Sequence, residues 1–322
     1  MTTTLDHPTP TRPSRPGPLR IALATVAVLA TLPYVVLKLL WLSGSGVGLA
    51  DPDAFSDPVM VTANAVTLLM ELTAAGLAVL LVLEVGRRIP AAVVHVPMFV
   101  GTGLLGGILV VLPVEAVRRS LSSPSAGPST GPSTAQGNAT DSPIADWVFA
   151  MVYGGFGVLG LSLLAIFALH AWDRWIRPGG WTTRVSAWVP TSARQRRLTV
   201  VHGVGMVVIC TAGLLVAARA DLVGSHDVVA VLMALVSSAG LIALALRSPG
   251  SVRGSTALVM AYAGAAVVAA WGLYFFVVLV LPNPLRGDEP VPAGLLALEL
   301  LRGVSGVMTA FAAARLGRVG HR

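Results

Sequence analysis

Residues 255–281 read STALVMAYAGAAVVAAWGLYFFVVLVL and contain no Asp, Glu, Lys or Arg. A helix rises about 1.5 Å per residue, so this stretch is long enough to cross a hydrocarbon core of about 30 Å. Inside hydrocarbon the backbone must satisfy its own hydrogen bonds, which a helix does. The stretch therefore predicts a transmembrane helix.

Seven further stretches have the same character, and they cover residues 20–42, 58–85, 91–113, 147–169, 198–218, 228–246 and 292–314. The chain is 55% hydrophobic and only 11% charged, with a mean hydropathy of +0.79. Soluble domains carry about 25% charged residues, so this chain cannot cover a water-facing surface. The first stretch is longer than the apolar region of about 7–15 residues in a signal peptide, so we expect a retained helix. The sequence predicts an all-α membrane protein, an eight-helix transmembrane bundle.

The positive charges predict an orientation. With eight crossings, sixteen arginines fall on one side and four on the other. The first group is Arg12, Arg15, Arg20, Arg87, Arg88, Arg174, Arg177, Arg184, Arg194, Arg196, Arg197, Arg247, Arg253, Arg315, Arg318 and Arg322; the second is Arg118, Arg119, Arg219 and Arg286. Basic residues favour the cytoplasmic side, so we expect both termini in the cytoplasm and the protein in the cell membrane. The net charge of +7 then suits the lipid bilayer and its anionic headgroups rather than nucleic acid.

The domain organisation follows from composition. Residues 1–19 predict a disordered cytoplasmic tail, residues 20–314 the transmembrane domain, and residues 315–322 a second cytoplasmic tail. Within the domain, the Ser/Pro/Gly-rich residues 120–146 predict a flexible outer linker. Short matches between 75–77 and 239–241 are consistent with a four-plus-four parallel duplication, and chance similarity between apolar segments is the competing explanation.

A long cytoplasmic loop, residues 170–197, interleaves aromatic and basic side chains. They are Trp172, Arg174, Trp175, Arg177, Trp181 and Trp188. Trp prefers the headgroup region and Arg pairs with anionic lipid, so these residues predict a lipid-interface segment along the inner leaflet. A surface for a protein partner is the alternative.

Soluble-enzyme signatures do not fit this chain. Gly101-x-Gly103-x-x-Gly106 has dinucleotide spacing but lies within an apolar stretch, where small residues serve helix packing. His95 and His202 lack a third metal ligand in the pattern, and the acidic connection with Asp51, Asp53 and Asp57 favours a solvated loop over a Ca²⁺ site. We predict no catalytic residues, no cofactor and no metal, and a protein that is not an enzyme.

Charges within the apolar stretches are the strongest functional signal, because ionisable groups at membrane depth usually pair or act. Glu71 lies near the middle of its stretch, and Glu299 and Arg302 lie three residues apart on one helix face. We predict one buried network of Glu71, Glu299 and Arg302. Lys38 is either a fourth member or extends its amine to the interface. The network either fixes helix register or lines a path for an ion or polar solute.

Two quoted stretches carry a resemblance. Residues 32–41, LPYVVLKLLW, precede a Gly-rich turn, and residues 86–90, GRRIP, precede PMFVGTGLL at 97–105. Together they resemble a group of uncharacterised multi-pass membrane proteins of high-GC Gram-positive bacteria. The resemblance implies location and fold class, with no activity, and it implies that Lys38 and Trp41 belong to a recurrent pattern at the outer face.

The functional expectation is an integral membrane protein with small-solute or ion transport near Glu71. The alternative is a structural or sensory component that binds a partner or anionic lipid through residues 170–197. A membrane-embedded enzyme comes third, because a catalytic site needs several convergent polar groups.

Overall fold

A computed structural model describes residues 17–50, 56–83, 85–122, 144–219, 223–281, 291 and 293–320. The predictions for residues 1–16, Asp51, Asp53 and most of the outer linker lie outside these residues. Within them, eight helices are long and apolar enough to cross a membrane, which confirms the predicted helical multi-pass architecture.

The first four spanning helices are α1 (Pro18–Leu42), α2 (Pro58–Val82), α4 (Ala91–Ser122) and α5 (Asp146–Ala171), with the short α3 (Val85–Arg88) after α2. The last four are α6 (Ala193–Arg219), α7 (Ser225–Leu246), α8 (Gly254–Val280) and α9 (Ala293–Gly320). A π-helical turn (Trp172–Ile176) and a 3-10 turn (Val185–Ala187) lie in the connector between α5 and α6.

Helix boundaries differ from the expected ones where a helix continues past the membrane core. Helix α4 runs on to Ser122, into the expected outer linker. Helix α6 begins at Ala193, which shortens the expected loop of residues 170–197, and α9 continues to Gly320 through most of the expected tail. Hydropathy locates the apolar core of a helix but gives no sign of polar turns that extend beyond it.

Local chemistry explains where two helices begin. Proline at the first turn of α2 needs no hydrogen-bond partner, and the Asp57 carboxylate accepts a hydrogen bond from the Val59 amide at 2.7 Å. Asp57, which the sequence placed in a solvated acidic loop, is therefore a helix cap. At α7 the Asp227 carboxylate accepts from the Gly224 amide at 3.2 Å, which ties an acidic side chain to the helix start.

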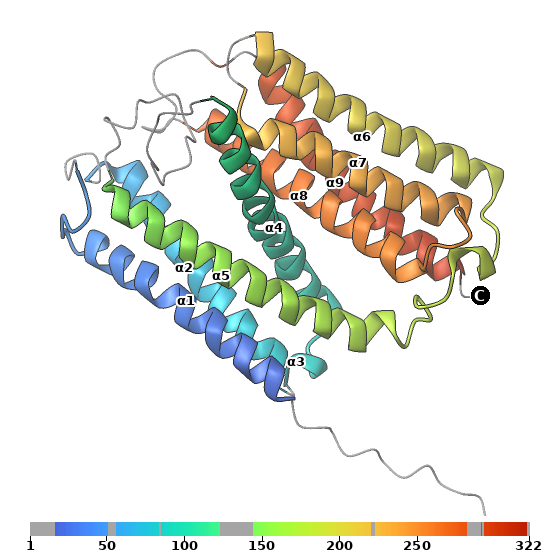
Figure 1. The fold of residues 1–322 in the computed structure, drawn as a ribbon, viewed down its shortest axis with the longest axis horizontal. Helices are drawn as coiled ribbons and strands as arrows, with labels where there is room; N and C mark the ends of the chain where they lie inside the picture. The colour runs from blue at the N-terminus through green and yellow to red at the C-terminus, as the bar shows by residue number, and fades with distance from the viewer. Residues whose placement is uncertain are drawn as a thin grey trace, which may run out of the picture.

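The spanning helices form two groups (Figure 1). Helices α1, α2 and α5 pack together, and helices α6 to α9 form a second bundle. Helix α4 packs against α5 on one side and against α7 and α8 on the other, so it joins the groups. The start of α1 and the end of α9 lie at the same end of the molecule, which we call the basic end because the arginines of the connector lie there too.

Close helix contacts in the second bundle depend on small residues. A Cβ atom at Gly264 would lie 2.5 Å from the Met233 carbonyl oxygen of α7, and one at Gly306 would lie 2.6 Å from the Ala265 carbonyl oxygen of α8. On α4, a Cβ at Gly103 would meet the Ala266 carbonyl oxygen at 2.2 Å. In lipid the hydrophobic effect does not drive helices together, so close packing of this kind is what holds them together. The glycines with dinucleotide spacing therefore include a packing residue, as the sequence analysis expected.

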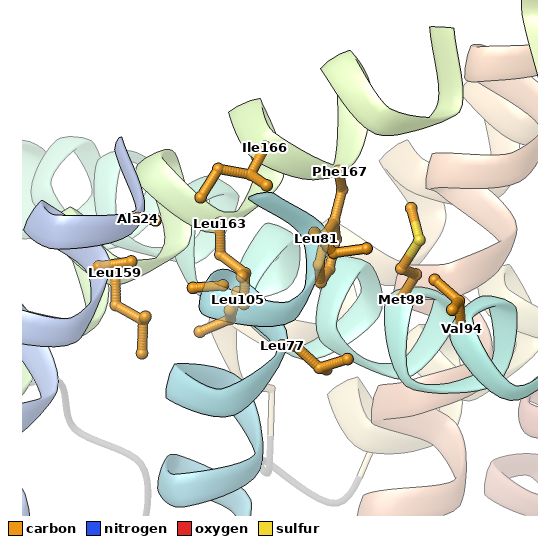
Figure 2. Close-up of a cluster of buried hydrophobic side chains, with 12 residues drawn as sticks. Ala24, Leu77, Leu81, Val94, Met98, Leu105, Leu159, Leu163, Ile166 and Phe167 are labelled. Atoms are coloured by element: carbon orange, nitrogen blue, oxygen red, sulfur yellow. The ribbon is translucent and has the colours of Figure 1, made fainter. Parts of the chain in front are cut away.

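The first group is held by larger side chains. Its core cluster joins α1, α2, α4 and α5 through residues such as Leu81, Met98, Leu163 and Phe167 (Figure 2). Three glycines of this group, Gly76, Gly154 and Gly157, have no atom within 4 Å of an added Cβ. These three glycines therefore make no close helix contact, unlike Gly264 and Gly306 of the second bundle.

Candidate functional site

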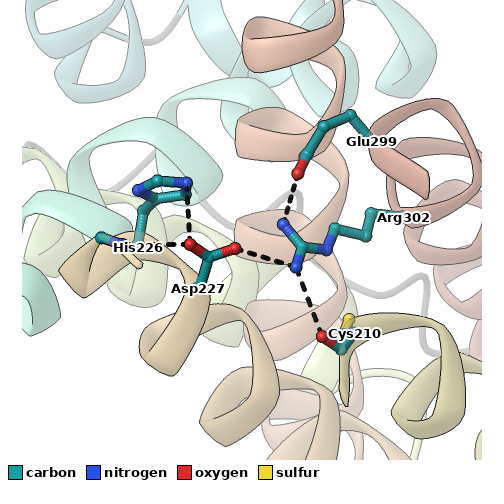
Figure 3. A network of polar contacts seen from close by, with 6 residues as sticks. Cys210, His226, Asp227, Glu299 and Arg302 are labelled. Carbon is teal, nitrogen blue, oxygen red and sulfur yellow. Dashed lines mark hydrogen bonds and ion pairs between the residues drawn. The ribbon is translucent and has the colours of Figure 1, made fainter. Parts of the chain in front are cut away.

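Arg302 on α9 is the centre of the first polar cluster (Figure 3). Its Nη1 donates to Glu299 Oε1 at 2.5 Å, one helical turn away, and its Nη2 donates to Asp227 Oδ1 on α7 at 3.0 Å. The same Nη2 lies 3.3 Å from the Cys210 carbonyl oxygen on α6. All three ionisable side chains are 2–3% exposed. Charged partners on two helices thus compensate the buried guanidinium.

The second bundle makes room for this guanidinium. A Cβ at Gly213 on α6 would lie 2.0 Å from Arg302 Nη2, so a larger residue there would displace it. His226 Nε2 lies 3.4 Å from Asp227 Oδ2, at the outer rim of the cluster, and its side chain is 30% exposed. Beside it, the Ser225 hydroxyl donates to Glu115 of α4. The cluster therefore begins near the end of the bundle opposite the basic end.

Lys38 on α1 is the centre of the second polar cluster. It is 1% exposed, and its Nζ donates to Thr67 Oγ1 and lies 3.4 Å from Asn64 Oδ1, both on α2. The ammonium also lies 4.4 Å from the centroid of the Tyr34 ring. Lys38 is therefore bound inside the protein, and the alternative in which its amine extends to the interface does not describe it.

Glu71 lies on α2 two helical turns after Asn64 and is close enough to Lys38 to interact with it electrostatically. It is 6% exposed and lines a cavity of about 390 Å³ between α1, α2 and α5. Besides Glu71, the only polar side chain in the lining is Tyr34. Val26, Leu29 and Val158 line the cavity and are also exposed on the outside, so the cavity is a groove that is open at the surface of the protein.

The four predicted network residues thus lie in two clusters. Glu299 and Arg302 contact each other as expected, and Lys38 lies near Glu71. Within the described residues, Arg302 bonds to α6, α7 and its own helix, whereas Glu71 faces α1 and α5. Similar depth along two helices does not bring them together when each helix packs in a different group.

Sequence reasoning missed the residues that complete both clusters. Asp227 lies one residue before the apolar stretch 228–246, and Glu115 lies two residues after 91–113, so both fall outside the stretches that were searched for charges. Asn64 is uncharged, so a search for charges within the apolar stretches does not identify it. A search for acidic residues within one turn before each apolar stretch would have found Asp227.

The connector between α5 and α6 is a folded part of the protein. Arg174 donates to the Gly86 and Ile89 carbonyl oxygens at 3.0 and 2.6 Å, and Trp188 is 5% exposed beneath Arg247. Trp175 and Trp181 are half-buried, whereas Trp172 and Arg177 are exposed. Only part of the predicted lipid-interface set therefore remains on the surface.

The two histidines that the sequence offered as metal ligands contact other side chains instead. His95 on α4 lies edge-on to the rings of Trp175 and Tyr262, and His202 on α6 bonds to the Thr309 hydroxyl at 2.8 Å. In the part of the chain that the structure describes, no group of three or more His, Cys, Asp or Glu side chains is placed to hold a metal ion.

Comparison of the chain with models of known families, with characterised proteins and with solved structures finds no match. The two clusters and the groove are therefore the features of the molecule that bear on function.

Proposed function

We propose that the protein moves a small solute or an ion across the membrane, with Glu71 as its contact point. The observation that carries this proposal is the groove of about 390 Å³ in which Glu71 is the one ionisable lining residue apart from the Tyr34 phenol. Ligand sites are concave and mostly apolar, with a few convergent polar groups, and the groove has this composition.

The chemistry of the groove favours a solute with two parts. Its apolar walls suit an apolar body, and the Glu71 carboxyl suits a cation or a hydrogen-bond donor. Lys38 donates hydrogen bonds to Asn64 and Thr67. Its ammonium group is therefore bonded without the Glu71 carboxyl, which faces the groove. We infer from the arginine distribution that the basic end is cytoplasmic and that the membrane is the cell membrane.

Water access to position 71 is the first test. In a Cys210→Ser background, Glu71→Cys is exposed to a membrane-impermeant thiol reagent, in proteoliposomes, from each side in turn. The matched control is Leu72→Cys, which is next in sequence and faces outward with 51% exposure. We expect labelling at position 71 and none at position 72, because the reagent needs water. Equal labelling at both positions, or none at position 71, contradicts a polar path.

Flux is the second test. Proteoliposomes containing ion-sensitive dyes report entry of H⁺, Na⁺ or K⁺, and Glu71→Gln is compared with Glu299→Gln. Flux that only Glu71→Gln abolishes supports the proposal for ions. If the wild-type protein conducts none of these ions and position 71 stays unlabelled, transport is the wrong function.

A second proposal concerns the basic end. Exposed Trp172 and Arg177 lie at the same end as the exposed Arg194, Arg196 and Arg197 at the start of α6, a combination that suits anionic headgroups. The measurement is the unfolding midpoint in phosphatidylglycerol and in phosphatidylcholine nanodiscs. A stabilisation by phosphatidylglycerol that Arg194→Gln/Arg196→Gln/Arg197→Gln removes supports lipid binding. The same shift in both proteins contradicts it, and then a protein partner for this surface becomes the better hypothesis.

A further inference from the structure

The Arg302 cluster contains more acid than base. Asp227 and Glu299 both pair with Arg302, at 3.0 and 2.5 Å, and all three are buried. Among the described residues that face this cluster, Arg302 is the only permanent cation. With both carboxylates ionised and His226 neutral, the cluster has a charge of −1. A net charge buried at membrane depth is costly, so the neutral cluster is favoured.

The groups that face the cluster from the neighbouring helices do not balance this charge. Helix α6 contributes the Cys210 thiol and backbone, helix α7 contributes His226, and helix α8 contributes the non-ionising rings of Trp271 and Phe275. Helix α4 contributes Glu115, another acid, through its bond with Ser225. Among the side chains that the structure describes, none of these helices places a second permanent cation against the cluster, and Arg219 at the end of α6 is exposed.

Glu299 is the group with an unused oxygen. Its Oε1 accepts from Arg302, while its Oε2 is buried without a hydrogen-bond partner. An unsatisfied carboxylate oxygen inside a protein costs far more than a neutral carboxyl group. Asp227 is different, because its oxygens accept from Arg302 and from the Gly224 amide. Asp227 is thus a carboxylate with both oxygens hydrogen-bonded, whereas Glu299 has one oxygen without a partner.

A small cavity lies between Glu299 and His226. Glu299, Arg302 and His226 line a cavity of about 10 Å³, close to the space of about 10–15 Å³ that one water molecule needs. His226 is 30% exposed and contacts Asp227 as well. An imidazole can accept a proton on one nitrogen and release one from the other, so it can pass protons between solvent and this space.

We propose that the Arg302 cluster is a binding site for one proton, which Glu299 holds and which exchanges with the end of the bundle opposite the basic end through His226. The proton adds to Glu299 Oε2 and neutralises the cluster, and Oε1 keeps its bond to Arg302. This site is separate from the Glu71 groove, and it stands whether or not the protein transports a solute.

Infrared spectroscopy of the purified full-length protein tests which group holds the proton. We expect the wild type to show, at neutral pH, the carbonyl stretch of a protonated carboxylic acid that Glu299→Gln removes. Gln keeps the size and the oxygen that accepts from Arg302, so it imitates the protonated form. Glu71→Gln is the matched control and retains the band. A band unchanged in Glu299→Gln overturns the proposal. If Glu299→Gln does not fold, Glu299→Asp replaces it, and a band that does not shift overturns the proposal equally.

Stability against pH gives the independent measurement. An unfolded chain has its glutamates ionised at neutral pH, so a proton held only by the folded state makes the folded fraction fall as pH rises. The expected effect is up to tenfold in the unfolding equilibrium per pH unit while the site titrates. Glu299→Gln should remove this slope.

His226→Gln decides between the two proton carriers. We expect it to keep the pH slope of stability and to slow exchange of the Glu299 proton, measured as the rate of the infrared band shift in D₂O. If His226→Gln removes the slope while Glu299→Gln retains it, the proton resides on His226 and the proposal is wrong.

Discussion

The two groups of helices solve the problem of buried charge differently. In the second bundle, Arg302 is bonded to two carboxylates within a bundle whose helices approach through Gly264 and Gly306. In the first group, Lys38 is bonded to uncharged side chains, and its nearest acid, Glu71, borders a groove. A closely packed site suits structure or a bound proton, whereas an open one suits an exchangeable ligand.

Helix pairing differs between the groups as well. Helix α7 packs extensively against α8. In the first group, α2 packs against α1 and α5, and α4, which has the position of α8, packs against α5 and against α7 and α8 of the second bundle. The four-plus-four duplication stays a prediction.

The largest effect is expected from Arg302→Leu. Its removal leaves Asp227 and Glu299 buried without a cation, and breaking such a pair costs about 3–5 kcal/mol. We expect a strong loss of folded, monodisperse protein, measured by size exclusion in detergent. The triple variant Arg302→Leu/Asp227→Asn/Glu299→Gln should recover most of it, because the carboxylates are then neutral. Equal stability of Arg302→Leu and the wild type would remove the contrast between the groups.

Valine substitutions of glycines compare the closeness of packing. Gly264→Val places a side chain against the backbone of α7, and overpacking of this kind costs about 1–3 kcal/mol. Gly157→Val on α5 is the matched change at a helical glycine with open space around its Cβ position. We expect Gly264→Val to lower the unfolding midpoint and Gly157→Val to leave it unchanged. A comparable decrease in both variants would show that the first group is packed as closely as the second.

Lys38→Met should cost less than the loss of Arg302, about 1 kcal/mol. The side chains that accept hydrogen bonds from Lys38 are neutral, and Thr67 retains a bond from its hydroxyl to the Ala63 carbonyl oxygen at 2.7 Å. The measurement is the unfolding midpoint, with Val36→Met as the control because Val36 is exposed on the same helix. A loss as large as that of Arg302→Leu would mean that Lys38 and Glu71 form a tight pair.

The smallest effect on stability is expected from Glu71→Gln, less than the loss of about 1 kcal/mol expected for Lys38→Met. Glu71 lines an open groove, and the amide keeps its size and polarity. Its effect should appear in labelling and flux instead of the unfolding midpoint. A decrease of several degrees with no functional change would assign Glu71 a structural role and would make the two groups alike.

How far the sequence led is clearest from individual residues. Apolar length alone predicted the spanning helices, because a bilayer leaves no other form for such runs. The local pair of Glu299 and Arg302 followed from helical spacing. The bond from Arg302 to Asp227 did not, because Asp227 lies on another helix and the rotation of α7 about its axis decides which way it faces. Burial of Trp188 was also unpredictable, since aromatic and basic residues suit an interface and a folded connector equally well.

The sequence by itself determined that this is a helical membrane protein with eight candidate spans and a few charges that need partners. Those are consequences of solvent: hydrocarbon excludes unbonded backbone and unpaired charge whatever the arrangement of helices. Only the tertiary structure decided which charges meet and where space remains. It placed Arg302 within a bundle of closely packed helices and Glu71 beside a groove, because contacts between helices depend on small residues and helix rotation that a pattern of hydropathy does not record.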